Sequence, residues 1–289
     1  MRLGIAVNAR RCMACYCCFT ACKDEHCGFS SSLSAAQPMM GQAWVDVREW
    51  ERGDSSRRVK TASVATMCAH CQEPACMKAA KDGAVYKRPD GIVIIDPNKS
   101  KGQKAIVDAC PIKAVFWNEE LEIPQKCTMC AELLDDPNYL AYLGDPALRN
   151  PRCVEACPNQ ALIFGDLDDP NSAISKLVAS EKNTQLEPLE GMETNVKWLS
   201  VPTVYLAGTV YCPKDLDEVC IGANVKLTCK ETGQTWETKT NYFGDWEVEW
   251  LPKNKNFDVE ITASGYKAAT YKAFTDADHY VDMTYLVSA

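Results

Sequence analysis

The sequence lacks any long apolar run and any recognisable export signal. No stretch approaches the roughly 18 apolar residues that a membrane-spanning helix needs. The opening segment, Met1 to Asn8, becomes polar too early for a signal peptide. We therefore expect a cytoplasmic chain without direct membrane insertion. Export of the folded chain alongside a signal-bearing partner is the alternative.

Recognisable catalytic motifs are absent as well. No nucleophile–base–acid pattern, paired-carboxylate site or glycine-rich phosphate loop stands out in the sequence. The formal net charge of −8 gives no reason to expect nucleic-acid binding. We therefore predict no catalytic residues in this chain and expect the chemistry to lie in a partner.

Cysteine, by contrast, is abundant. The 289 residues include 17 cysteines, and 14 of these lie before residue 158, bunched at short spacings. Only Cys212, Cys220 and Cys229 lie outside the bunched region. Disulfide frameworks are typical of small secreted chains, and this chain is long and shows no signal. The bunching therefore indicates metal, either as zinc sites or as iron–sulfur clusters.

Composition and pattern predict three segments. Residues 1–165 contain all the bunched cysteines, whereas residues 166–200 contain none. In the second segment, Asp169-Pro170 predicts the N-cap and first-turn proline of a short helix that ends near Lys182. An irregular polar stretch follows this helix. We therefore interpret residues 166–200 as a linker to a third segment, residues 201–289.

The third segment changes to a period of two. Apolar and polar residues alternate in three runs: Val225, Leu227 and Cys229; Trp246, Val248 and Trp250; Phe257, Val259 and Ile261. This pattern predicts six or seven short strands in a small antiparallel β-sandwich or barrel. Four short motifs resemble transthyretin-like β-sandwich modules: Gly208-Thr209-Val210, Gly222-Ala223-Asn224-Val225, Asn241-Tyr242-Phe243-Gly244 and Ser264-Gly265-Tyr266.

The first cysteine group has the spacing Cys12-x2-Cys15-x2-Cys18-x3-Cys22. In bacterial ferredoxins, three cysteines of such a group hold one cluster and the fourth ligates another. A tight turn brings three thiolates to one face of a cubane, and the helix that follows carries the fourth away. Four cysteines in eleven residues would crowd a tetrahedral zinc site. The group therefore favours iron–sulfur clusters.

Three further groups follow, and one of them is eroded. The second is Cys68-x2-Cys71-x4-Cys76, with Ala80 where a fourth cysteine would fall. The third should follow a hairpin predicted at Gly91 to Asp96. There the expected spacing falls on Ser100, Gln103, Ile106 and Cys110. The fourth group is Cys127-x2-Cys130, a 22-residue insertion, then Cys153-x3-Cys157.

These spacings resemble the four-cluster ferredoxin-like subunits of molybdenum enzymes in the dimethyl-sulfoxide-reductase family. The resemblance implies an α+β chain in which residues 1–165 form two interlocked bacterial-ferredoxin-like modules. It pairs the first group with the fourth and the second with the third. The implied ligands of three [4Fe–4S] clusters are Cys12, Cys15, Cys18 and Cys157; Cys22, Cys127, Cys130 and Cys153; and Cys68, Cys71, Cys76 and Cys110.

A fourth cluster would need Ala80, Ser100, Gln103 and Ile106, none of which is a cysteine. Random erosion would leave a half-built site, whereas here all four losses fall in one site. We therefore expect three clusters.

Three longer segments carry a closer resemblance: Cys22 to His26, Asp90 to Pro97, and Gln125 to Cys130. They are similar to the small subunits of pyrogallol–phloroglucinol transhydroxylases, and catechol dehydroxylases of gut bacteria belong to the same broad group. The resemblance implies a heterodimer or larger assembly with a large subunit that carries molybdenum on two pterin guanine dinucleotides. This chain would be its electron-transfer subunit, with no active site of its own.

The implied substrates are polyhydroxylated aromatics, which the complex would convert by hydroxyl transfer or reductive dehydroxylation. One alternative is an electron-transfer subunit of another molybdenum, formate or sulfur-compound reductase. A third interpretation, less favoured, is a zinc-stabilised scaffold in which the β domain does the binding.

Cysteines outside the twelve ligands have plain interpretations. We expect Cys17 and Cys27 to be packed thiols. Cys212 and Cys220 can pair as a disulfide in an oxidising compartment, but we favour small hydrophobic residues in a β core.

Two basic residues beside the ligands have two interpretations each. His70 can be a proton-coupled group near a cluster, but we favour a partly exposed loop residue. Lys126 can tune a reduction potential through its charge, and the simpler expectation is a solvated lysine.

Overall fold

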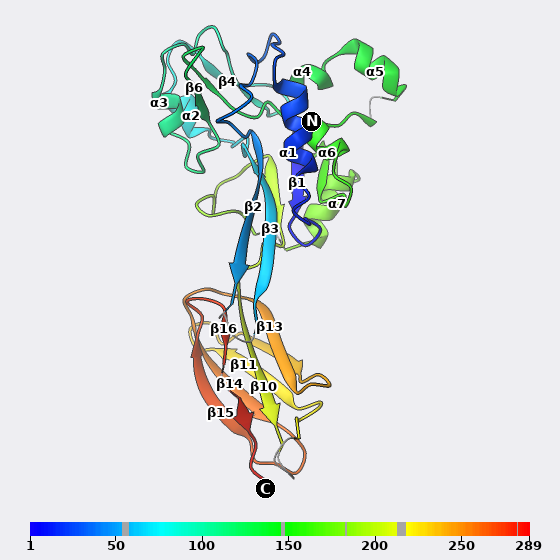
Figure 1. Cartoon of the computed structure of the whole chain (residues 1–289), viewed down its shortest axis with the longest axis vertical. Helices are drawn as coiled ribbons and strands as arrows, with labels where there is room; N and C mark the ends of the chain where they lie inside the picture. Colours follow the sequence, from blue (N-terminus) through cyan, green and yellow to red (C-terminus); the bar gives the residue numbers. More distant parts are fainter. Residues whose placement is uncertain (54–57, 146–147, 183, 213–217, 282) are drawn as a thin grey trace. The chain divides into compact units, whose positions relative to one another are not determined.

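The structure is a computed structural model that describes residues 1–53, 58–145, 148–182, 184–212, 218–281 and 283–289. The chain forms two compact units, and neither is continuous in sequence (Figure 1). The first unit comprises Met1–Glu49 and Ser63–Val201; the second comprises Trp50–Ala62 and Pro202–Ala289. The hairpin of β2 (Val45–Arg52) and β3 (Lys60–Met67) therefore contributes residues to both units.

A three-stranded sheet lies in the first unit. Its central strand, β1 (Leu3–Asn8), pairs antiparallel with β8 (Leu162–Asp166) and parallel with β9 (Val196–Leu199). All six residues of β1 are buried, as expected for a strand with neighbours on both sides. Helix α7 (Ala173–Ser180) packs Ile174 into the same apolar cluster as Ala6.

Short elements that connect the cysteine groups complete the first unit. They are α1 (Cys17–His26), α2 (Ala75–Ala79), β4 (Val85–Lys87), β5 (Val93–Ile95), α3 (Ala105–Asp108), β6 (Phe116–Asn118), β7 (Ile123–Gln125), α4 (Ala131–Leu134), α5 (Pro137–Leu143) and α6 (Arg152–Glu155). Strands β4 and β5 pair antiparallel, and Gly91 turns between them at φ +86°, so the predicted hairpin is confirmed. In the described part of the chain, no helix is long and apolar enough to cross a membrane.

Residues 166–200 differ from the predicted linker. Helix α7 begins at Ala173, because the Ser172 hydroxyl accepts the Ser175 amide at 3.1 Å and forms the N-cap. Asp169, the expected cap, instead accepts the Asn171 amide at 2.9 Å and closes a turn before the helix. Strand β9 then joins β1, so this segment is built into the sheet of the first unit.

Two four-stranded sheets form the second unit. One follows the order β12 (Thr235–Lys239), β11 (Asn224–Cys229), β14 (Asn256–Thr262) and β15 (Ala269–Phe274). The other contains β13 (Asp245–Leu251), β10 (Val204–Tyr211), β16 (His279–Tyr280) and β17 (Thr284–Tyr285). Buried side chains from both sheets form one core, so the unit is a β-sandwich. The sheets are not wholly antiparallel, since β16 and β17 run parallel to β10.

The predicted alternation holds in two of the three runs and breaks in the third. Trp246 and Val248 are buried as predicted, but Trp250 is only half-buried and has a φ of +55°. The register between β10 and β13 shifts between Val204 and Leu206, which is typical of a β-bulge. The bulge turns Trp250 away and places Leu251 in the core instead.

Ion pairs join the hairpin tip to the sandwich within the second unit. The guanidinium of Arg52 donates to both carboxylate oxygens of Asp278, at 3.0 and 2.9 Å, and to the carbonyl of Thr203 at 2.6 Å. Lys60 pairs with Glu247 and Glu249 on β13. The Arg52 and Asp278 side chains are 5% and 9% exposed, so this pair has little access to solvent screening.

Cys212 and Cys220 form a disulfide, which corrects the expectation of two unpaired hydrophobic thiols. The residues are brought together because the Cys220 amide donates to the Val210 carbonyl at 2.8 Å, and Tyr211 bridges to Val219.

Candidate metal centres

The first cysteine group spans a loop, which carries Cys12 and Cys15, and helix α1, which carries Cys18 and Cys22. Ala14 and Tyr16 have φ values of +53° and +58°, and these left-handed residues coil the loop tightly before the helix starts. Burial raises the pKa of the Cys18 thiol to about 12. Part of this rise comes from three nearby thiols, namely Cys12, Cys157 and Cys15. The four residues predicted for one cluster are thus electrostatic neighbours in the folded chain.

A second set of four thiols is fully enclosed. Burial raises the pKa of the Cys130 thiol well above its ordinary value. Three other thiols contribute to that rise, namely Cys153, Cys22 and Cys127. All four of these cysteines are buried, so water has little access to this site.

The third set combines a loop, helix α2 and the turn after α3. Burial raises the pKa of the Cys71 thiol to about 11. Part of this rise in the pKa comes from the thiols of Cys68, Cys76 and Cys110. Cys71 also forms a β-bridge with Thr194, which holds the loop beside the edge of β9. In each set the electrostatic neighbours are residues that the family resemblance assigns to one cluster, and that assignment stays a prediction.

The donor sets suit iron–sulfur clusters chemically. In each of four loops, a backbone amide donates a hydrogen bond to a cysteine sulfur: His70 to Cys68 at 3.5 Å, Ala114 to Cys110 at 3.3 Å, Met129 to Cys127 at 3.3 Å and Ala161 to Cys157 at 3.2 Å. Such N–H···S bonds stabilise thiolates and are one of the protein's means of tuning a cluster. Thiols lose their protons when they bind metal. The positive charge of the metal then offsets the cost of burying the thiolate. Among the described residues, no three His, Cys, Asp or Glu side chains are arranged around a single metal ion.

The four positions where the spacing would place a fourth cluster carry other residues. Ile106 is fully buried in an apolar cluster with Cys76, and Ala80 packs against that cluster. The Gln103 carboxamide accepts the Lys81 amide at 2.8 Å and donates to the Lys99 carbonyl at 2.7 Å. Three of the four replacing residues therefore pack or hydrogen-bond, whereas the fourth, Ser100, is 0% exposed and its hydroxyl has no partner among the described residues.

His70 and Lys126 both differ from the favoured interpretations. His70 is 0% exposed and Lys126 only 3% exposed, so neither is a solvated surface residue. Each is buried because the loop that carries it packs against β5, where Val93 contacts both side chains. Sequence alone could not show this, since histidine and lysine are usually exposed or half-exposed.

His26 is a residue whose role the sequence analysis missed. Its Nδ1 lies 3.1 Å from a Glu132 carboxylate oxygen, and its Nε2 lies 3.6 Å from the Cys130 sulfur. The ring packs against Trp44, with centroids 4.9 Å apart. Burial raises the pKa of Glu132 and the His26 contact lowers it, with a net downward shift, so the carboxylate stays ionised and orients the ring. The only sequence clue was the position of His26, four residues after the ligand Cys22.

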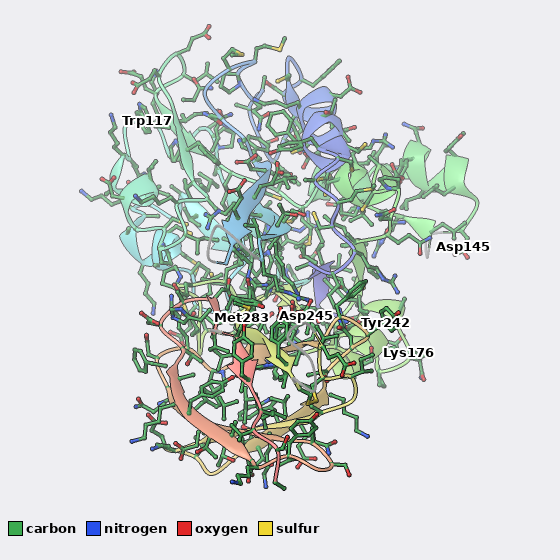
Figure 2. The ribbon with its side chains drawn as sticks, turned by 60° about the horizontal axis from the view of Figure 1, so that its bottom comes forward. Trp117, Asp145, Lys176, Tyr242, Asp245 and Met283 are labelled. Carbon is green, nitrogen blue, oxygen red and sulfur yellow. A yellow bond between two sulfur atoms is a disulfide. The ribbon has the colours of Figure 1, made fainter. Side chains whose placement is uncertain are left out.

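Trp117 is a half-buried residue of β6 that contacts two charged side chains. Its indole N–H donates to Glu119 at 2.9 Å, and the Lys104 ammonium lies 5.4 Å from the ring centroid. Figure 2 shows it at the periphery of the first unit.

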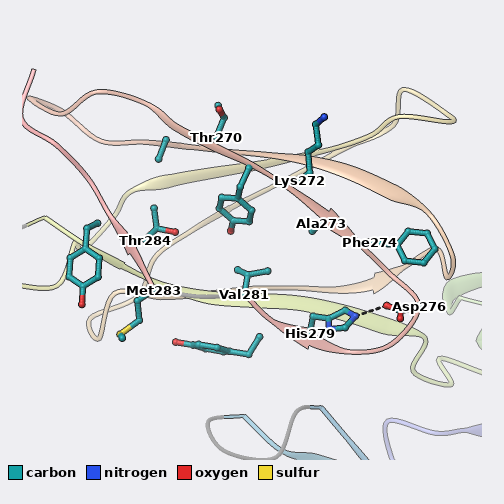
Figure 3. Close-up of a pocket in the computed structure, with 13 residues that line it drawn as sticks. Thr270, Lys272, Ala273, Phe274, Asp276, His279, Val281, Met283 and Thr284 are labelled. Atoms are coloured by element: carbon teal, nitrogen blue, oxygen red, sulfur yellow. Dashed lines mark hydrogen bonds and ion pairs between the residues drawn. The ribbon is translucent and has the colours of Figure 1, made fainter.

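A groove of about 810 Å³ lies in the second unit between β15 and the segment that carries β16 and β17 (Figure 3). Tyr271, Val281 and Met283 are among its lining residues, and His279 pairs with Asp276 at 2.6 Å. None of the twelve grouped cysteines lines this groove.

Comparisons with known proteins identify related iron–sulfur proteins. Residues 59–167 match a family described as a 4Fe-4S dicluster domain. The pyrogallol hydroxytransferase small subunit of Pelobacter acidigallici is 32% identical over 98% of this chain and 97% of that one. A sulfite dehydrogenase subunit of Allochromatium vinosum is 33% identical over 65% of this chain and 78% of its own. A putative dimethyl sulfoxide reductase iron-sulfur subunit of Halobacterium salinarum is 29% identical, over 68% of this chain and 78% of its own.

Solved structures add no argument about the fold. The TIE protein of Bacillus anthracis, for example, has a TM-score of 0.26 and covers 32% of this chain and 18% of its own.

The ferredoxin-like fold and its cysteine groups define an iron–sulfur electron-transfer protein. More particularly, the chain belongs to the iron–sulfur subunits of molybdenum oxidoreductases in the dimethyl-sulfoxide-reductase family.

Proposed function

We propose that this chain holds three [4Fe–4S] clusters and conducts electrons for a molybdenum-containing large subunit. The observation that supports the proposal is that Cys18, Cys130 and Cys71 each have the other three cysteines of their implied cluster among their electrostatic neighbours. Below, the first, second and third groups are the sets of four that contain Cys18, Cys130 and Cys71. Two of the four replaced positions support the count, because Ile106 is buried in an apolar cluster and the half-buried Ala80 packs against it.

The chain's own residues would place the three sites in a row. Cys153 of the second group has Cys18 of the first among its electrostatic neighbours. Cys127 of the second group likewise has Cys68 of the third. These neighbours support an order in which the fully enclosed second group lies between the other two.

A [4Fe–4S] cluster accepts or releases one electron with little rearrangement, and the protein sets its potential through burial, charge and hydrogen bonds to sulfur. The loop amides at His70, Ala114, Met129 and Ala161 would stabilise the thiolates that hold the clusters. His26, oriented by Glu132, would donate to the Cys130 sulfur in the enclosed site. We infer that the chain supplies conduction and no catalytic group.

The full-length likeness to the Pelobacter acidigallici small subunit supports a more specific partner. The partner would be a large subunit with molybdenum bound to two pterin guanine dinucleotides, in a heterodimer or larger assembly. The substrates would be polyhydroxylated aromatics, converted by hydroxyl transfer or reductive dehydroxylation. The likeness to the sulfite dehydrogenase subunit keeps a sulfur-compound enzyme as the alternative.

Metal analysis of the anaerobically purified chain tests the cluster count. Three cubanes predict about twelve irons and about twelve acid-labile sulfides per chain. About sixteen irons would contradict the loss of the fourth site. Zinc without sulfide would replace the electron-transfer proposal by the scaffold interpretation.

Purification of the native complex tests the partner and the substrate. We expect a molybdopterin-containing subunit to co-purify with this chain and to act on pyrogallol or catechols. Activity confined to sulfur compounds or formate would leave the electron-transfer role intact and reject the aromatic substrate.

A further inference from the structure

Lys126 is a buried cation between two of the cysteine groups. It follows β7 directly and precedes the ligand Cys127, and it is 3% exposed. Its ammonium donates to the Cys127 carbonyl at 3.0 Å and to the Val93 carbonyl. Val93 lies on β5 in the apolar cluster that contains Cys76 of the third group. One side chain thus joins the loop of the second group to the wall of the third.

The same Val93 residue binds His70 through its amide. The Val93 amide donates to His70 Nδ1 at 3.0 Å, so the proton of the neutral imidazole lies on Nε2. His70 is completely buried, and in the described part of the chain its Nε2 has no hydrogen-bond partner. A buried N–H without an acceptor indicates that another group completes this region. The ligands nearest to His70 in sequence, Cys68 and Cys71, both belong to the third group.

Lys126 also lacks an opposite charge within the protein. Among the described residues, none of the ion pairs includes its ammonium. A buried ammonium without a counter-charge is costly, so a folded chain that retains one is expected to place an anion nearby. The thiolates of the neighbouring groups are the anions within its electrostatic reach. The two carbonyls that bind the ammonium place it beside the ligand Cys127 and against the apolar wall that contains Cys76.

We propose that Lys126, held by the Val93 and Cys127 carbonyls, is the shared counter-cation of the second and third groups and raises the reduction potentials of both clusters. The inference rests on the proposed function, because it requires clusters at these groups. Reduction adds one electron, and therefore one negative charge, to a site. A fixed positive charge in a medium of low dielectric constant favours the reduced state. One residue would thereby raise the potentials of two neighbouring carriers together.

The test is a mediated redox titration of the whole complex, followed by low-temperature EPR. In Lys126→Met the charge is lost while the length of the side chain is nearly kept. We expect the reduction equilibria of two clusters to fall at least tenfold, which is ~59 mV each for one electron. The reduction equilibrium of the remaining cluster, which the first group holds, should shift by a smaller factor. Lys126→Arg keeps the charge and should leave all three potentials near the wild-type values.

Lys78→Met is the matched control. Lys78 lies on α2, two residues after the ligand Cys76, but its side chain is 66% exposed and pairs with Glu73 at 2.9 Å. Water screens this charge, so its loss should shift no potential as far as Lys126→Met does. Equal shifts in the two variants, or no shift in Lys126→Met, would overturn the proposal.

A second variant covers the case in which Lys126→Met loses iron. Lys126→Gln removes the charge but keeps an N–H donor for the two carbonyls, and the same downward shift of two clusters is required of it. Iron content and EPR of the wild-type complex are measured first. Their failure would reject the clusters themselves, whereas normal iron with unchanged potentials would reject only the role of Lys126.

Discussion

Replacing Cys110 by serine is expected to remove the cluster of the third group and leave the other two in place. Cys110 supplies the fourth thiol of this group, after Cys68, Cys71 and Cys76. A serine oxygen is a poor substitute for a thiolate at an iron–sulfur cluster. Iron should fall from about twelve to about eight per chain, and EPR should lose the signal of one cluster.

Cys27→Ser is the matched control for this change. The Cys27 thiol lies outside the three groups and donates to the Pro38 carbonyl at 3.5 Å, an acceptor that a serine hydroxyl can also use. The variant should keep all of its iron. If Cys110→Ser instead lost the cluster held by Cys18 or the cluster held by Cys130, the assignment of Cys110 to the same cluster as Cys68, Cys71 and Cys76 would be wrong.

Arg52→Met is expected to destabilise the second unit strongly. The substitution removes both hydrogen bonds to Asp278 and leaves that carboxylate buried without its cation. Breaking a buried ion pair from one side typically costs roughly 3–5 kcal/mol. Denaturant unfolding followed by tryptophan fluorescence should report a loss of this size in the transition of the sandwich, whose core contains Trp246.

Two controls separate charge burial from general damage to the hairpin. Arg48→Met changes an exposed residue on the same strand, and it should alter stability by no more than ~0.5 kcal/mol. Arg52→Met combined with Asp278→Asn removes both charges but keeps a carboxamide oxygen for the Tyr205 amide, which lies 2.8 Å from Asp278. The double variant should be more stable than Arg52→Met alone. A double variant that is equally unstable would show that the packing of Arg52, and not its charge, holds the hairpin tip.

Sequence reasoning reaches furthest where the determining pattern is local. The spacing of Cys12 to Cys22 involves one loop and one helix, so it predicts a cluster motif directly, and that assignment stays a prediction. The strand alternation around Val225 and Val259 likewise reflects one buried face. Both features depend on neighbours a few residues away, which a sequence displays.

Other features depend on contacts between distant residues and were predicted wrongly or missed. His70 and Lys126 are buried because both contact Val93, 23 and 33 positions away. The β-bulge that exposes part of Trp250 arises from the pairing of β13 with β10, which the alternation of β13 alone does not reveal. The strand character of β9 was hidden because its partner, β1, lies at the opposite end of the first unit's sequence.

The division of the second unit between two stretches of chain has a consequence for biosynthesis. Arg52 and Asp278 are 226 positions apart, so the ribosome makes the hairpin tip long before its binding partner. At typical elongation rates the interval is ~10 to 45 seconds. During that time Arg52 and Lys60 have no sandwich to bind, although every grouped cysteine is synthesised before the ribosome reaches the second stretch of this unit at Pro202. A shortened chain that ends at Val201 would preserve this immature state, so residues 50–62 should be redesigned together with any removal of the sandwich.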